Sequence, residues 1–388
     1  MAFDRVLAQS TTKDRLMRAL VDGRLAHAYL LHGPSGVGAE ALAIELAKAV
    51  NCVNGPGEPC QVCIPCRKIG TLQHPDVRLY LPLPSPSAKS AKAGERTDGE
   101  SDDETDERAS RGEDREARRQ ELLAILAESP YVPLPFNKRD HHGIDDIREL
   151  RREASVKPYE GRRKVVILVA ADRMTADASN ALLKTLEEPP GDLLLVLTTD
   201  RPHRLLPTIL SRCQPVRLSR LADDVLAEAL TRWFHVDPGR VPFAVRQADG
   251  SLSRALASAS ERGETLRTTA VAFLDTIHTG TMVDVFDRID QFLTAHKETP
   301  LIEEILDILI GYYRDLFILL ETRDDEAVQN LDRRDWLMTL AGQTSAGQVE
   351  TAIDAIHTIK QALARNAHPP LALTVLALRL RACRKPAA

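Results

Sequence analysis

Residues 30–40, with the sequence LLHGPSGVGAE, decide the fold. A short apolar run precedes Gly33-x4-Gly38, and ALAIELAKAV follows, which predicts a strand, a tight turn and a helix. A complete phosphate-binding loop continues with Lys and then Ser or Thr, since the lysine neutralises phosphate charge and the hydroxyl holds Mg²⁺. Ala39 and Glu40 stand at those two positions. The stretch therefore predicts a nucleotide-binding fold without the residues that nucleotide chemistry needs.

The strand–helix alternation continues along the first half of the chain. Residues 164–170 (KVVILVA) and 192–200 (DLLLVLTTD) are apolar runs typical of buried parallel strands. Helical patterns at 144–158 and 179–190 separate or follow them, and a short one lies at 204–213. This order predicts an α/β sheet covered by helices on both faces.

Three domains are expected from the change of pattern along the chain. Residues 1–219 form the α/β domain, 220–262 a small helical lid, and 263–388 a larger helical bundle. Residues 85–117 are rich in Ser, Gly, Ala and charge and almost lack large apolar groups, so we expect a disordered acidic insertion there.

Composition limits the classes of function. The 388-residue chain is 43% hydrophobic, has a net charge of −5, and contains no uninterrupted apolar run long enough to span a membrane. Residues 95–121 alone hold 12 acidic and 6 basic side chains, so the remainder is close to neutral, which argues against a free-standing DNA-binding protein. The N-terminal stretch MAFDRVLAQS has no apolar run or basic leader, and we expect a cytoplasmic protein.

Four of the six cysteines stand close together in CVNGPGEPCQVCIPC, with the spacing C-x7-C-x2-C-x2-C. Four thiolates complete the tetrahedral shell of Zn²⁺ and leave no position for water. In a reducing compartment such a cluster favours metal over disulfides. We expect a structural zinc module over residues 52–66, with ligands Cys52, Cys60, Cys63 and Cys66; Cys213 and Cys383 lie too far along the chain to belong to it.

Several stretches together resemble the AAA+ clamp loader subunits of bacterial DNA polymerase III. They follow the family's order, span most of the chain, and include the four-cysteine module. The matching stretches are residues 23–38 (GRLAHAYLLHGPSGVG), 74–77 (HPDV), 180–190 (NALLKTLEEPP), 197–200 (LTTD), 206–213 (LPTILSRC), 250–256 (GSLSRAL) and 364–373 (ARNAHPPLAL). The resemblance implies an AAA+ module with the zinc unit inserted, then an all-α lid and an all-α collar.

Departures from the family's active ATPases fall on three separate nucleotide contacts. Their positions are Ala39-Glu40 in place of Lys-Thr, Val169-Ala170 in place of Asp-Glu, and Ser253 in place of the second sensor's arginine, with Arg254 displaced by one. Asp172, beyond the second site, is expected to point elsewhere. We therefore expect no intrinsic ATPase activity, and ATP binding that is absent or weak, through the backbone N–H groups of the loop glycines Gly33, Gly36 and Gly38.

One functional residue of the family is kept. The resemblance makes Arg212, in the SRC stretch, an arginine finger that acts in trans on ATP held by a neighbouring subunit. Thr199 matches the first sensor position, and with no nucleotide bound its hydroxyl is as well explained by a role at the strand end.

The resemblance implies a non-hydrolysing stator of the DNA polymerase III holoenzyme, a DNA-directed DNA polymerase. Its partners would be the clamp loader ATPase (gamma/tau) subunits and the delta subunit, with the sliding clamp and primed DNA reached through the complex. Two alternatives stay open: an active clamp loader ATPase subunit, and a stand-alone zinc-dependent nucleic-acid-binding protein.

Overall fold

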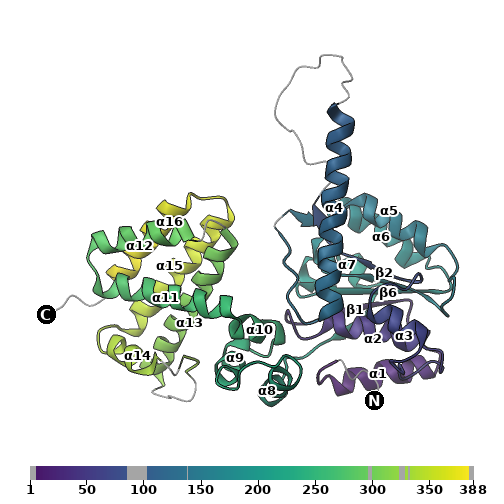
Figure 1. Ribbon diagram of the computed structural model, residues 1–388, viewed down its shortest axis with the longest axis horizontal. Coiled ribbons are helices and arrows are strands. Elements are labelled where there is room, and N and C mark those ends of the chain that lie inside the picture. Colours follow the sequence, from purple (N-terminus) through teal and green to yellow (C-terminus); the bar gives the residue numbers. More distant parts are fainter. Residues whose placement is uncertain are drawn as a thin grey trace. The chain divides into compact units, whose positions relative to one another are not determined.

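A computed structural model of the chain describes residues 6–84, 103–137, 139–295, 299–322, 328–330 and 333–383 (Figure 1). The chain divides into two compact units. The first contains Met1–His235 with Ala248–Arg254, and the second Val236–Gln247 with Ala255–Ala388.

A five-stranded parallel sheet forms the centre of the first unit, in the order β2-β5-β6-β1-β7. All residues of β5 and β6 are buried, which explains their continuous apolar runs. His32 at the end of β1 is in register with Thr199 at the end of β6, so both strands end beside the glycine loop. The strands are β1 (Ala28–His32), β2 (Val77–Tyr80), β5 (Lys164–Leu168), β6 (Leu193–Thr199) and β7 (Gln214–Arg217).

Helices cover both faces of this sheet. Figure 1 shows α5 (Ile144–Ala154) and α6 (Ala176–Glu187) on one side, and α2 (Ala39–Asn51) with α3 (Ile64–Gly70) on the other. Alternate strand residues such as Leu30 and Leu195 pack in one core with α5 and α6. The remaining elements of this unit are α1 (Ser10–Val21), β3 (Leu83–Pro84), α4 (Asp103–Glu128), β4 (Asp140–His141), η1 (Ala171–Arg173), η2 (Pro202–Arg204), α7 (Pro207–Leu210) and α8 (Asp223–Arg232).

Part of the predicted disordered insertion is helical. Residues 85–102 lie outside the described residues, and residues 103–117 belong to α4; disorder of the insertion stays a prediction. The apolar residues that anchor the helix, Leu122 and Leu126, come after the acidic stretch and are buried. Packing of these leucines fixes the C-terminal end of α4. The helix can then continue toward its N-terminus through polar residues that would not form a stable helix alone.

Helices alone make up the second unit within the part of the chain that is described. One core of aliphatic and aromatic side chains, including Phe273, Leu309 and Tyr313, holds them together. The helices are α9 (Val241–Ala248), α10 (Leu252–Ala259), α11 (Glu261–Thr279), α12 (Met282–Ala295), α13 (Thr299–Glu321), α14 (Arg334–Ala341), α15 (Ala346–Ala364) and α16 (Pro369–Ala382). The last residue of α9 and the first three residues of α10 belong to the first unit.

The predicted fold class is confirmed: an α/β module with a parallel sheet and flanking helices is followed by all-α structure. The three-domain division stays a proposal, since residues 220–262 are shared between the two compact units. No helix among the described residues is long and apolar enough to span a membrane.

Candidate functional site

The glycine loop connects β1 to α2 and packs tightly against the rest of its own unit. Gly36 and Gly38 have φ of 77° and 100°, in the left-handed region that favours glycine. A Cβ added at Gly38 would lie 2.8 Å from the Tyr131 ring, and one at Gly36 would lie 2.5 Å from Ser253. One at Gly33 would lie 2.6 Å from the carbonyl oxygen of Leu218. The three predicted glycines are thus required by packing and backbone conformation, without any phosphate.

A cavity of about 220 Å³ lies beside this loop. Ligand pockets of proteins usually measure ~300–1,000 Å³, so the space is small for a nucleoside triphosphate. One wall is apolar and comes from the end of α4 and the segment that follows it. The lining residues of that wall are Leu126, Pro130, Val132, Pro133, Leu134 and Phe136.

Glu40 occupies the position of the Mg²⁺-binding hydroxyl and is held by the end of β6. Thr198 Oγ1 donates a hydrogen bond of 2.9 Å to Glu40 Oε1. Burial raises the pKa of Glu40, and the nearby carboxylate of Asp200 raises it further. Neither Glu40 nor Ala39 offers a positive charge to a phosphate, in agreement with the sequence prediction.

Asp172 points into the cavity, which corrects the expectation that it points elsewhere. Ala170 has φ of 50° and is the N-cap of the 3₁₀ turn η1, so the chain bends shortly after β5. Thr199 Oγ1 donates a hydrogen bond of 2.7 Å to Asp172 Oδ1 and accepts one of 2.9 Å from Arg201 N. The sensor-like hydroxyl is therefore fully engaged inside the chain.

The basic residues near the cavity are also occupied. Arg173 Nη1 donates to the carbonyl oxygens of Asn137 and Asp140, at 2.9 and 3.3 Å. Arg201 Nε lies 3.7 Å from Asp200 Oδ1. Arg254, one residue beyond the sensor position, pairs with Asp249 at 3.6 Å and does not line the cavity. Arg173 and Arg201 line the cavity, and each has a partner within the chain.

Arg212 follows the short helix α7 and stays accessible. Its side chain is 36% exposed, and Nη2 lies 2.9 Å from Glu187 Oε1 at the end of α6. Nη1 donates to the carbonyl oxygen of Thr208 at 3.1 Å. The sequence does not indicate this ion pair, because Glu187 and Arg212 are 25 positions apart in the chain. The guanidinium is thus held at the surface, and Arg212 does not line the cavity beside the glycine loop.

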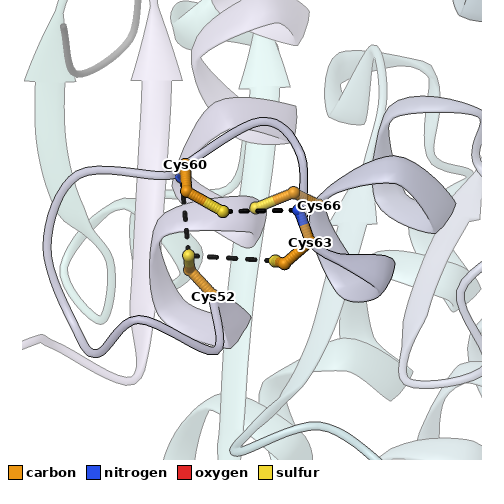
Figure 2. A group of neighbouring side chains, drawn as sticks. All are labelled: Cys52, Cys60, Cys63 and Cys66. Atoms are coloured by element: carbon orange, nitrogen blue, oxygen red, sulfur yellow. Dashed lines mark hydrogen bonds between the residues drawn. The ribbon is translucent and has the colours of Figure 1, made fainter.

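The four predicted zinc ligands converge at the start of α3 (Figure 2). Their sulfur atoms all lie within 4.8 Å of one another, and those of Cys52 and Cys63 are 3.9 Å apart. Two sulfurs of a Zn²⁺ tetrahedron with 2.3 Å bonds are separated by ~3.8 Å, so the cluster fits the ion. Backbone N–H groups of Cys60 and Cys63 point at sulfurs of the cluster, at 3.5 and 3.4 Å, and hydrogen bonds of this kind stabilise thiolates.

A matching family and two similar relatives are all subunits of DNA polymerase III. The family described as "DNA polymerase III, delta subunit" matches residues 8–222, more than half of the chain. DNA polymerase III subunit delta' of Bacillus subtilis is 28% identical over 313 residues, covering 81% of this chain and 78% of that protein. DNA polymerase III subunit tau of the same organism is 25% identical over 402 residues. The match covers 97% of this chain but only 61% of the tau subunit.

Among solved structures, a gamma subunit-related protein of DNA polymerase III from Thermotoga maritima is similar. It shares 17% identity with a TM-score of 0.44, over 95% of this chain and 98% of that one.

Proposed function

Because this chain belongs to the family of DNA polymerase III delta subunits, we propose that it is a delta-prime-type subunit that does not itself hydrolyse ATP. The chain is a clamp loader subunit of DNA polymerase III. The loop chemistry supports the finer assignment, since Ala39 and Glu40 replace the cation and the hydroxyl. The cavity of about 220 Å³ beside the loop supports it as well.

Arg212 is the residue that we propose acts on a neighbour. A guanidinium is always charged and planar, and it stabilises the charge that develops on a transferring phosphoryl group. The main support for this proposal is that Arg212 is partly exposed at the surface and oriented by its ion pair with Glu187. The chain's own glycine loop lacks the phosphate-binding residues. Supplied in trans, this charge makes ATP turnover by the neighbouring subunit depend on assembly.

The partners follow from the same proposal. The neighbour that receives Arg212 is a gamma/tau-type ATPase subunit, and the delta subunit completes the complex. The assembly loads the sliding clamp on primed DNA, in the cytoplasm. In this role the chain is a stator: it contributes a fixed surface and one charge, and undergoes no nucleotide cycle of its own.

Neither alternative from the sequence gains support. An active ATPase subunit would need a cation and a paired carboxylate at the loop, and Ala39 and Val169 provide neither. A stand-alone nucleic-acid-binding protein would need a strongly basic surface, whereas the chain's net charge is −5.

The four-cysteine cluster supports a structural zinc site in the same proposal. Cys52 and Cys66 are buried, and the four sulfur atoms lie within 4.8 Å of one another. Four thiolates would fill the tetrahedral shell of Zn²⁺, as in structural zinc sites. Zinc would fix the loop between α2 and α3, and it would take no part in phosphoryl transfer.

The test of the proposed function is ATP turnover by the assembled clamp loader with Arg212→Ala in this subunit. We expect normal co-purification with the ATPase subunit and a loss of turnover of at least about tenfold, since arginine fingers contribute strongly to the chemical step. The matched control is Arg204→Ala, which removes an exposed arginine eight residues earlier and should leave turnover unchanged. Normal turnover by the Arg212→Ala complex would contradict the finger assignment.

A further inference from the structure

Residues 129–136, with the sequence SPYVPLPF, lie against the glycine loop and form what we name the plug segment. It follows α4, the helix that continues from the acidic insertion. Tyr131, within this segment, is buried, with 2% exposure. Its ring reaches Gly38, the N-cap of α2, so closely that an added Cβ would lie 2.8 Å from Cε1 and from the hydroxyl oxygen.

Tyr131 is fixed by two segments that are distant in the sequence. Leu7 N donates a hydrogen bond of 2.7 Å to its hydroxyl oxygen. Ser253 Oγ donates to its backbone carbonyl oxygen, and Ser253 itself packs against Gly36. Both hydrogen bonds are buried, where a lost partner costs ~1–3 kcal/mol, so the ring is held in place.

Tyr131 lies beside the place where a phosphate would bind. Backbone N–H groups at the start of a helix that follows a glycine loop attract anions, and α2 begins at Ala39. Here the ring of Tyr131 lies against Gly38, and the side chain of Ser253 lies against Gly36. The rest of the plug segment lines the remaining cavity, at Pro130 and from Val132 to Leu134.

We propose that the plug segment is a built-in occupant of the nucleotide pocket, held by Leu7 and Ser253, and that it excludes nucleotide independently of the missing lysine. Loss of the lysine and hydroxyl weakens attraction for a phosphate, but steric overlap with a fixed side chain prevents close approach altogether. The glycine loop then keeps its conformation because Tyr131 supports it in the place of a ligand. This inference deepens the non-hydrolysing role proposed above, and it does not depend on Arg212.

The experiment measures binding of the fluorescent analogue mant-ATP, with Mg²⁺, to the isolated full-length chain. The double variant Ala39→Lys/Glu40→Thr restores the lysine and the hydroxyl. We expect this variant to bind mant-ATP no better than the unchanged chain. Adding Tyr131→Ala should then lower the dissociation constant at least about tenfold, the equivalent of ~1.4 kcal/mol.

The control adds Tyr159→Ala to the double variant, because this tyrosine belongs to the same unit and is 87% exposed. It should produce no gain in affinity. Thermal melting checks that each variant folds; if Tyr131→Ala does not, Tyr131→Leu keeps an apolar side chain too short to cover the loop. Tight binding by the double variant alone, no gain from either Tyr131 substitution, or an equal gain from Tyr159→Ala would each overturn the plug. Turnover by the assembled complex tests Arg212 separately.

Discussion

His142 shows how a single buried side chain sets a pH limit on the first unit. It is fully buried beside the end of β5, with Nε2 2.7 Å from the carbonyl oxygen of Val169. Its Nδ1 has no partner within the described structure. Burial lowers the pKa of His142 to about 4, although the hydrogen bond to Val169 opposes this shift.

Acid should therefore destabilise the protein through His142. The unfolded chain takes up a proton as the pH falls below about 6.5, while the folded chain resists until about pH 4. Stability from this residue is thus complete above pH 6.5 and lost between 6.5 and 4, on the order of 3 kcal/mol in total. Urea unfolding of His142→Gln should show a smaller drop across this window than the wild type.

The control for that measurement is His203→Gln, an exposed histidine in η2. Its pH dependence should match that of the wild type. Equal acid sensitivity in His142→Gln and the wild type would show that another group causes the loss.

Site features that depend on neighbours in the sequence could be predicted. Contacts between residues that only the fold brings together could not. The cysteine spacing and the replaced loop residues are local patterns, and the structure has them as expected. The contact of Tyr131 with the loop joins residues 93 positions apart. No pattern in SPYVPLPF indicates such a contact, since a tyrosine between prolines is typical of many surface loops.

At the level of elements, the zinc module is tied to α2 by a buried polar network. Lys48 and Glu45 on α2 form an ion pair of 2.6 Å with almost no exposure. Gln61, from the loop between the cysteines, bonds to both: its Oε1 accepts from Lys48 at 3.0 Å and its Nε2 donates to Glu45 at 2.6 Å. Without Gln61, Lys48 and Glu45 would each lose a hydrogen-bond partner while remaining buried. The loop between the cysteines therefore stabilises α2.

Removal of one zinc ligand should therefore destabilise more than the module. We expect Cys60→Ser to abolish bound zinc, measured by atomic absorption, and to lower the melting temperature by roughly 5 °C, because the adjacent Gln61 loses its position. Cys383→Ser alters a cysteine outside the cluster and should change neither quantity. Full zinc content in Cys60→Ser would exclude this cysteine as a ligand.

Helix α4 overlaps the stretch for which composition predicts disorder. The composition of residues 85–117 contains too few apolar groups to fold alone, and that physical argument is sound for an isolated segment. The helix is anchored near its C-terminal end by the buried side chains of Leu122 and Leu126. Arg115 adds an ion pair with Asp146 and a hydrogen bond to the carbonyl oxygen of Pro84. Strands β1, β5 and β6 and helix α6 were predicted, because the apolar pattern of each is complete within its own segment.

On the scale of the whole molecule, each compact unit has a hydrophobic core of its own. Leu182 belongs to the core between the sheet and α6, and Leu309 to the core of the helical unit; both are completely buried. The sequence predicted this change of architecture after residue 219 from the end of strand–helix alternation. It did not predict that the chain crosses between the units more than once, because short helices carry no signal of the core that they join.

Separate cores predict two thermal transitions in differential scanning calorimetry. Leu182→Ala and Leu309→Ala each remove a buried side chain of the same size, and each should cost ~2–5 kcal/mol in its own unit. For units of this size 1 kcal/mol corresponds to ~2–4 °C, so each substitution should lower one transition by roughly 4–20 °C and leave the other in place. Zinc chelation should lower the same transition as Leu182→Ala, because the cysteine cluster belongs to that unit. A single transition, lowered alike by both substitutions, would mean that the two cores unfold as one.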